Sequence, residues 1–127
     1  MGKVIEKVKI TSVLDPSKSI ELDAVIDTGA TITALPQNIV VALGLKKIRK
    51  VKVRYANNET QSKFIYGAVS IEIKGRAGTF DVLAESEGAQ PLIGQVVLEV
   101  LDFVVDPTTR TLTPNPQSPD MPMVEML

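Results

Sequence analysis

Apolar and polar side chains alternate along several stretches of the chain, and this two-residue period constrains the fold more than any other feature. The alternation is clearest over 67–74, where polar residues separate Val69, Ile71 and Ile73. A period of two places every second side chain on one face of an extended strand. Apolar residues make up 44% of the chain and aromatic residues only 4%, so Val, Ile, Leu and Ala must form the core. Because β-branched side chains suit a pleated surface, we predict an all-β fold.

Turn-forming residues divide this pattern into short strands. Asp15-Pro16-Ser17-Lys18 predicts the first turn, because Asp opens turns and Pro already has the required φ angle. Ala56-Asn57-Asn58-Glu59 predicts a hairpin tip, because Asn tolerates positive φ angles. Pro36 at a first helical position and Gly44 past the end predict a short helix between them, and 95–101 predicts a second. The predicted strands cover residues 3–14, 19–26, 31–35, 47–55, 60–65, 67–74, 79–85, 103–105 and 109–112.

The composition excludes several kinds of chemistry. The chain contains no histidine and no cysteine. Ser-His-Asp and Cys-His nucleophile systems, disulfides and the usual histidine-rich zinc sites therefore cannot be built. An enzyme made from this chain must take its acid and base from carboxylates, lysines or tyrosines, and we expect no metal and no cofactor.

Charge and hydropathy restrict the partners. The 14 basic and 15 acidic side chains are spread along the chain, so we expect no nucleic-acid partner. No segment approaches the length of a membrane-spanning helix, and the residues after Met1 lack the apolar stretch of a signal peptide. We therefore expect no membrane partner and a cytoplasmic location.

The chain has the length of one domain, and its composition changes near the C-terminus. A chain of 127 residues can bury a modest core without disulfides. Four prolines follow Thr113 in close succession, so we predict a domain over 1–112 and an extended, flexible arm over 113–127. The sequence leaves open whether the apolar end of this arm docks against a neighbouring chain or hangs free.

Asp27 is the most unusual carboxylate in the sequence. It ends the apolar run Ala24-Val25-Ile26 and enters a turn at Thr28-Gly29. A buried carboxylate is costly without a partner or a proton, and the apolar run supplies no cation. The simplest explanation is an Asx turn, in which the Asp27 side chain accepts hydrogen bonds from the amides of Gly29 and Ala30.

The sequence around Asp27 also indicates a catalytic role for this residue. Asp27-Thr28-Gly29-Ala30 follows a predicted hairpin and precedes a short helix, and Leu92-Ile93-Gly94 also precedes a short helix. Together these motifs resemble the retropepsin-like aspartic proteases, a single-lobed homodimeric family that includes the retroviral enzymes. The resemblance covers roughly residues 4–112. It implies a small closed β-barrel of the retropepsin type with one or two short helices.

The resemblance also implies roles for particular residues. Asp27 would be the catalytic carboxylate, Thr28 would hydrogen-bond across the dimer, and Gly29 would let the two loops approach closely. The Leu92-Ile93-Gly94 element would support the active-site loop, although the following Gln95 departs from the Arg or Asn common there. Residues 52–64 would form a flap over a peptide or protein substrate. Residues expected to contact this substrate are Ala30, Tyr55, Ala56, Asn57, Asn58 and Ile93.

The sequence thus predicts an aspartic endopeptidase. Two carboxylates held close together share one proton, so one acts as a base toward water while the other acts as an acid. Because the chain contains a single Asp-Thr-Gly motif, a two-fold homodimer must supply the second carboxylate. One alternative is a non-catalytic relative that uses the same dimer for peptide binding or assembly. Phosphoryl transfer through an aspartyl-phosphate is less compatible with this sequence. The motif expected for that reaction is Asp-Lys-Thr-Gly-Thr, and this chain lacks its lysine.

Overall fold

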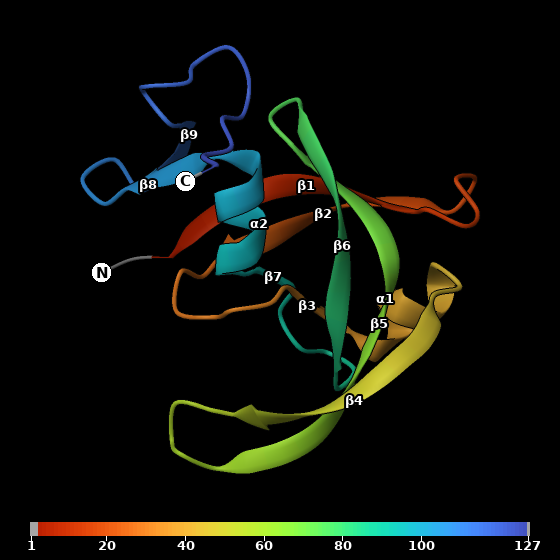
Figure 1. The fold of residues 1–127 in the computed structure, drawn as a ribbon. Coiled ribbons are helices and arrows are strands. Elements are labelled where there is room, and N and C mark those ends of the chain that lie inside the picture. The colour runs from red at the N-terminus through yellow and green to blue at the C-terminus, as the bar shows by residue number, and fades with distance from the viewer. Residues whose placement is uncertain (1–2, 127) are drawn as a thin grey trace.

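The computed structural model describes residues 3–126 and shows a mostly β molecule with two short helices (Figure 1). The predicted all-β fold class is therefore confirmed. The elements along the chain are β1 (Val4–Ser12), β2 (Ser19–Ile26), β3 (Ala34–Pro36), α1 (Gln37–Ala42), β4 (Lys46–Arg54), β5 (Thr60–Ile73), β6 (Arg76–Glu85), β7 (Leu92–Ile93), α2 (Gln95–Leu101), β8 (Phe103–Asp106) and β9 (Thr111–Pro114).

A mixed seven-stranded sheet forms the body of the molecule, in the order β1-β2-β7-β3-β6-β5-β4. β1 also pairs with β5, so that all of these strands except β4 close into a ring. β2 pairs in parallel with β7, with Val25 opposite Leu92 and Ile26 opposite Ile93. This pairing brings the strand that precedes Asp27 beside the strand that precedes Gly94.

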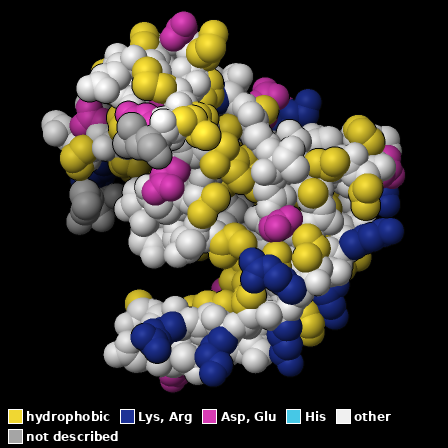
Figure 2. Space-filling model, in the orientation of Figure 1, with side chains coloured by type: hydrophobic (Ala, Val, Ile, Leu, Met, Phe, Trp, Pro, Cys, Tyr) yellow, Lys and Arg dark blue, Asp and Glu magenta, His cyan; other side chains and the backbone are white. Residues whose placement is uncertain are grey.

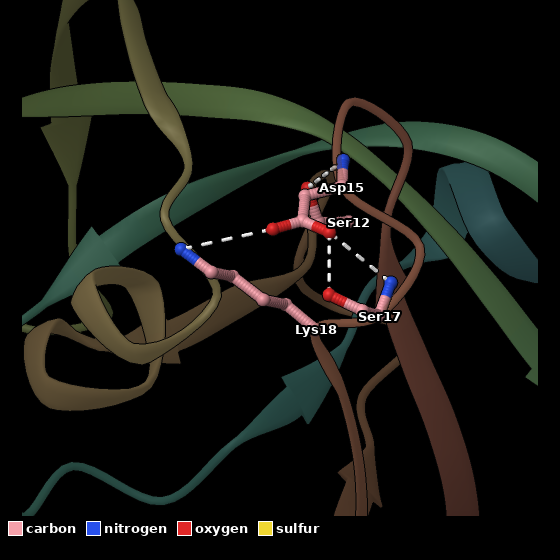
Figure 3. A network of polar contacts seen from close by, with 4 residues as sticks. All are labelled: Ser12, Asp15, Ser17 and Lys18. Carbon is pink, nitrogen blue, oxygen red and sulfur yellow. Dashed lines mark hydrogen bonds and ion pairs between the residues drawn. The ribbon is translucent and has the colours of Figure 1, made fainter.

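The first hairpin turns where the sequence predicts it (Figure 3). The Lys18 N–H donates to the Asp15 carbonyl at 2.9 Å. The Asp15 carboxylate accepts hydrogen bonds from the Ser17 hydroxyl at 2.5 Å and the Ser17 N–H at 3.3 Å. The hydrogen bond from the Ser17 hydroxyl is the main cause that lowers the pKa of Asp15. The turn therefore closes through contacts between neighbours in the sequence.

β5 is longer than the sequence predicts. Residues 60–73 form one continuous strand, whereas the pattern predicts two strands separated near Tyr66. The pairing with β6 shifts register between Tyr66 and Val69. The strand continues through this irregularity, and its burial still alternates, with Ile65, Gly67, Val69 and Ile71 buried.

Pro36 belongs to a strand and not to the first turn of the helix. Its φ of −64° suits both conformations, but its ψ of 149° is extended. Pro36 pairs with Glu85 of β6, and this tertiary pairing selects the extended form. The helix therefore starts at Gln37. Among residues 3–126, no helix has the length and apolar character needed to cross a membrane.

Two apolar clusters hold the sheet together. The larger one fills the ring, and its fully buried members include Val8, Ile10, Val69, Ile71, Ile73, Val82, Ile93 and Leu112. The smaller cluster consists of Ala34, Ile65 and Leu83, with Ile32, Val51, Val53 and Leu92 packed against it. The smaller cluster joins the β4–β5 hairpin to β3, β6 and β7 and to Ile32 in the loop after Asp27.

The segment after β9 is held by a buried arginine and by Asp102. Arg76 is buried and donates hydrogen bonds to the carbonyls of Leu101, Asp102 and Ser118. The Asp102 carboxylate accepts hydrogen bonds from the Ser118 hydroxyl, the Asn115 side chain and the Met123 N–H. The Ser118 hydroxyl is the first cause that lowers the pKa of Asp102. The division of the chain at 112 stays a prediction.

Candidate active site

Asp27 follows β2 directly and opens the loop that leads to β3. Its N–H donates to the Ile93 carbonyl at 2.9 Å, which ties the start of the loop to β7. Its carboxylate oxygen Oδ1 accepts a hydrogen bond from the Gly29 N–H at 2.9 Å. The expected Asx turn is present, although the Ala30 N–H donates to the Asp27 carbonyl at 3.2 Å and not to the carboxylate.

The turn presents polar atoms outward. Asp27 is half-buried, while Thr28 and Gly29 are exposed. Within residues 3–126, neither the second carboxylate oxygen Oδ2 of Asp27 nor the Thr28 hydroxyl has a hydrogen-bond partner. Both groups are free to meet water, a ligand or another chain.

The start of α2 supports the loop through backbone groups. The Gly94 N–H donates to the buried Thr33 hydroxyl at 3.2 Å. A Cβ atom at Gly94 would lie only 2.6 Å from the carbonyl carbon of Ile32, so this position needs the absence of a side chain. The N–H groups of Gln95 and Val96 donate to the carbonyls of Ala30 and Thr31 at 2.7 and 3.1 Å.

The Gln95 side chain takes no part in this support. Its Nε2 donates to Glu99 Oε1 at 3.3 Å, one helical turn further along α2. The resemblance described above implies an Arg or Asn at this position, whereas this chain holds the loop through the Gln95 backbone amide. The sequence identifies the position but not this mode of support, and no local pattern singles out Thr33.

The β4–β5 hairpin carries the other predicted substrate contacts. Its tip closes through hydrogen bonds from the Asn58 N–H to the Tyr55 carbonyl at 2.9 Å and from the Glu59 N–H to Asn57 Oδ1 at 3.0 Å. Asn58 has a positive φ of 66°, as the turn prediction requires. The hairpin projects from the body, and Figure 2 shows a hollow between the two.

Tyr55 connects the hairpin to the body. Its hydroxyl donates to the two carboxylate oxygens of Glu85 at distances of 3.1 and 3.0 Å. Lys63 Nζ lies 3.2 Å from Glu85 Oε1. Burial first, and then the hydrogen bond and negative charge of Glu85, raise the pKa of Tyr55 to about 12. The role of Glu85 cannot be read from the sequence, because no local pattern distinguishes it from other strand-end carboxylates.

A second hollow lies against the loop and α2, with a volume of about 440 Å³. Its lining combines loop residues with apolar side chains of α2 and charged side chains of β4 and β6: Thr31, Ile32, Thr33, Arg49, Asp81, Val96 and Val100. In the described part of the chain, no group of three or more carboxylates is placed to hold a metal ion.

A comparison with protein families identifies a matching family. A family model described as gag-polyprotein putative aspartyl protease matches residues 18–100. The chain belongs to this family. The matched region contains the Asp27 loop, the whole β4–β5 hairpin and the Leu92-Ile93-Gly94 element. A comparison with curated proteins found no match.

In this aspartyl protease family member, the structure brings some predicted site residues together and separates others. Asp27 and Ile93 meet through a backbone hydrogen bond, but the Ile93 side chain is fully buried in the larger cluster. Ala30 is half-buried in the loop. The hairpin-tip residues belong to a different part of the chain and contact the body through the Tyr55 hydroxyl.

Proposed function

We propose that the protein is an aspartic endopeptidase that works as a homodimer, in which each chain contributes one Asp27. The observation that carries this proposal is the outward-facing Asp27 turn. It leaves Oδ2 without a partner in the described chain, while Oδ1 and the backbone hold the side chain in place. The family match supports the protease class.

The proposed reaction needs two such turns facing each other across a two-fold axis. Two carboxylates about 3 Å apart share one proton, since both cannot ionise at low cost. The ionised carboxylate takes a proton from a water molecule, whose oxygen attacks the peptide carbonyl carbon. The protonated carboxyl group hydrogen-bonds to the carbonyl oxygen. Proton transfer to the peptide nitrogen and cleavage of the C–N bond then release an amine and a carboxylic acid.

The other residues of the proposed site position the loop and the peptide. Thr28, exposed beside Asp27, would hydrogen-bond to the partner's loop. Gly29 leaves space beside the carboxylate, because a Cβ atom there would lie 3.2 Å from Asp27 Oδ1. An extended peptide would lie between the loop and the hairpin, held by main-chain hydrogen bonds. Ala30 and the tip residues Tyr55 to Asn58 would contact it, and Ile93 would act through its carbonyl and its buried side chain.

Asp27→Asn tests this proposal. The Asn side chain keeps an oxygen that accepts from the Gly29 N–H, so the turn is preserved while the carboxylate is lost. We expect the cleavage of peptides to fall by about 1000-fold or more, with an unchanged melting temperature and oligomeric state. Asp23→Asn, at an exposed position of β2, is the control and should cleave as fast as the parent. Equal cleavage by the Asp27→Asn protein would refute the assignment.

One observation favours a non-catalytic relative as the second candidate. Asp27 already has a structural use, because its side chain closes the turn through Gly29. In that case the dimer would bind peptides without cleaving them. Binding of extended peptides with equal affinity by parent and Asp27→Asn proteins, together with no cleavage by the parent, would identify this function.

A further inference from the structure

Glu85 occupies a distinctive place between the hairpin and the body. Its carboxylate accepts from the Tyr55 hydroxyl through both oxygens and pairs with Lys63 Nζ at 3.2 Å. The side chains of Lys63 and Glu85 are only 18% and 20% exposed, so solvent screens this pair less than an ordinary surface pair. We refer to Tyr55, Lys63 and Glu85 as the hairpin latch.

The register of the strands places the hairpin latch on the same face as the smaller apolar cluster. Residues directly opposite each other in paired strands share a face, and alternate residues along a strand do so too. Lys63 lies opposite Val51, and Ile65 lies opposite Leu83. Lys63 and Glu85 are therefore on the face of Val51, Ile65 and Leu83. Tyr55 continues the same face of β4, beyond Val53.

The outer part of the hairpin has little other support. β4 lies at the edge of the sheet, and β6 ends at Glu85, so the hairpin beyond Lys63 is a two-stranded ribbon. A ribbon of two strands is only marginally stable by itself. Within residues 3–126, the Tyr55 hydroxyl makes the side-chain hydrogen bonds that join the tip, residues 54–60, to the rest of the chain.

Glu85 itself is firmly held. It pairs with Pro36 at the end of β3, and the nearby Leu83 N–H donates to the Thr33 carbonyl at 2.8 Å. Thr33 also accepts the hydrogen bond from Gly94 that supports the Asp27 loop. The hairpin latch therefore fixes the hairpin tip relative to the same backbone that positions Asp27.

From this geometry we infer that Glu85 is a positioning residue that holds the β4–β5 hairpin over the peptide groove, with Tyr55 as its partner on the hairpin. The inference deepens the proposed function, on which its account of peptide binding rests. A hairpin that is already held in place before the peptide arrives does not have to become ordered when the peptide binds. If the hairpin is open for part of the time, the apparent affinity falls in proportion to the closed fraction.

Hydrogen exchange in the substrate-free protein tests the hairpin latch without any assumption about catalysis. Tyr55→Phe removes only the hydroxyl, and Glu85→Ala removes the acceptor. We expect both to accelerate amide exchange over residues 52–62 by about 3- to 10-fold and to leave β1 unchanged. The double variant should add little to Glu85→Ala alone, because that substitution already removes the acceptor of the Tyr55 hydroxyl. Lys52→Gln, at an exposed position on the opposite face of the hairpin, should exchange like the parent.

Steady-state kinetics provides the second measurement. Tyr55→Phe and Glu85→Ala should raise KM for peptide cleavage about 3- to 10-fold and change kcat less, since the two Asp27 residues are untouched. Glu85→Gln should give an intermediate KM, because its amide oxygen still accepts from Tyr55 while the ion pair with Lys63 is lost. Exchange over 52–62 that is unchanged in Tyr55→Phe would overturn the inference. Absence of cleavage by the parent would count against the proposed function and leave the exchange result valid.

Discussion

Among single residues, Tyr55 shows how a contact made far along the chain changes the chemistry of a side chain. The sequence identifies it only as the residue before a hairpin tip. In the structure, partial burial and the carboxylate of Glu85 raise the pKa of its phenol to about 12. Because a tyrosine with a raised pKa favours its neutral form, the Tyr55 hydroxyl keeps its proton and can donate to the Glu85 carboxylate at neutral pH.

The raised pKa of Tyr55 predicts an alkaline transition. The pKa of Tyr55 has its ordinary value of 10.0 in the unfolded chain and is about 12 in the folded one. The contribution of Tyr55 to stability is therefore complete below pH 10. The contribution is lost as the pH rises from about 10 to about 12. Absorbance at 295 nm in a Tyr66→Phe background follows Tyr55 alone, since the chain has two tyrosines and no tryptophan.

The Glu85→Gln protein is the matched comparison for this titration. We expect its Tyr55 midpoint to move down toward the ordinary value, although not to reach it, because burial remains. Circular dichroism at each pH identifies the range in which the fold persists. The same midpoint in both proteins within that range would show that Glu85 does not act on Tyr55.

At the level of elements, the start of α2 supports the Asp27 loop through its backbone. Gly94 approaches Ile32 so closely that even a methyl group would meet backbone atoms. The side chain of Gln95 points instead to Glu99 on its own helix. The loop therefore depends on the absence of a side chain at one position and on a main-chain N–H at the next.

Two alanine substitutions separate these contributions. Gly94→Ala should lower the free energy of unfolding by about 1–3 kcal/mol, because the new methyl group forces the Ile32 backbone to move. It should also reduce kcat, since the displaced loop carries Asp27. Gln95→Ala keeps the N–H that donates to Ala30 and should change stability by less than about 0.5 kcal/mol. Urea denaturation of the two variants measures both effects, and a larger loss for Gln95→Ala would contradict this account.

For the whole molecule, the proposed site requires two carboxylates, whereas one chain contains a single Asp-Thr-Gly motif. The ring of strands places the Asp27 turn at the surface with a free carboxylate oxygen. A second copy of the chain is the simplest source of the partner carboxylate. The proposed activity is then a property of the assembly and depends on protein concentration.

Subunit mixing tests this dependence. An excess of Asp27→Asn protein added to the parent should suppress cleavage, because most parent chains then sit in hybrid dimers with a single carboxylate at the site. The same excess of Asp23→Asn protein should not suppress cleavage, since its hybrids keep both Asp27 residues. Specific activity should also fall on dilution, in parallel with the dimer fraction measured by analytical ultracentrifugation. Activity that stays constant while the protein becomes monomeric would exclude the shared site.

The sequence by itself determined the features that depend on neighbours along the chain. The two-residue alternation predicts most of the strands, Asp15 and Pro16 predict the first turn, and Asn58 adopts the positive φ expected of a hairpin tip. The Asx turn at Asp27 also follows from local residues, because the side chain reaches an amide two positions away. Hydrogen bonds and backbone preferences over such short distances depend little on the rest of the fold.

Only the tertiary structure decided how these pieces meet. The parallel pairing of β2 with β7, the extended form of Pro36 and the contact of Tyr55 with Glu85 each join segments far apart in the sequence. Local patterns do not encode such contacts, because many strand-end residues have the same local character and the sheet register selects which of them come together. The tertiary structure also shows that Gln95 supports the loop through its backbone N–H, while its side chain bonds to Glu99.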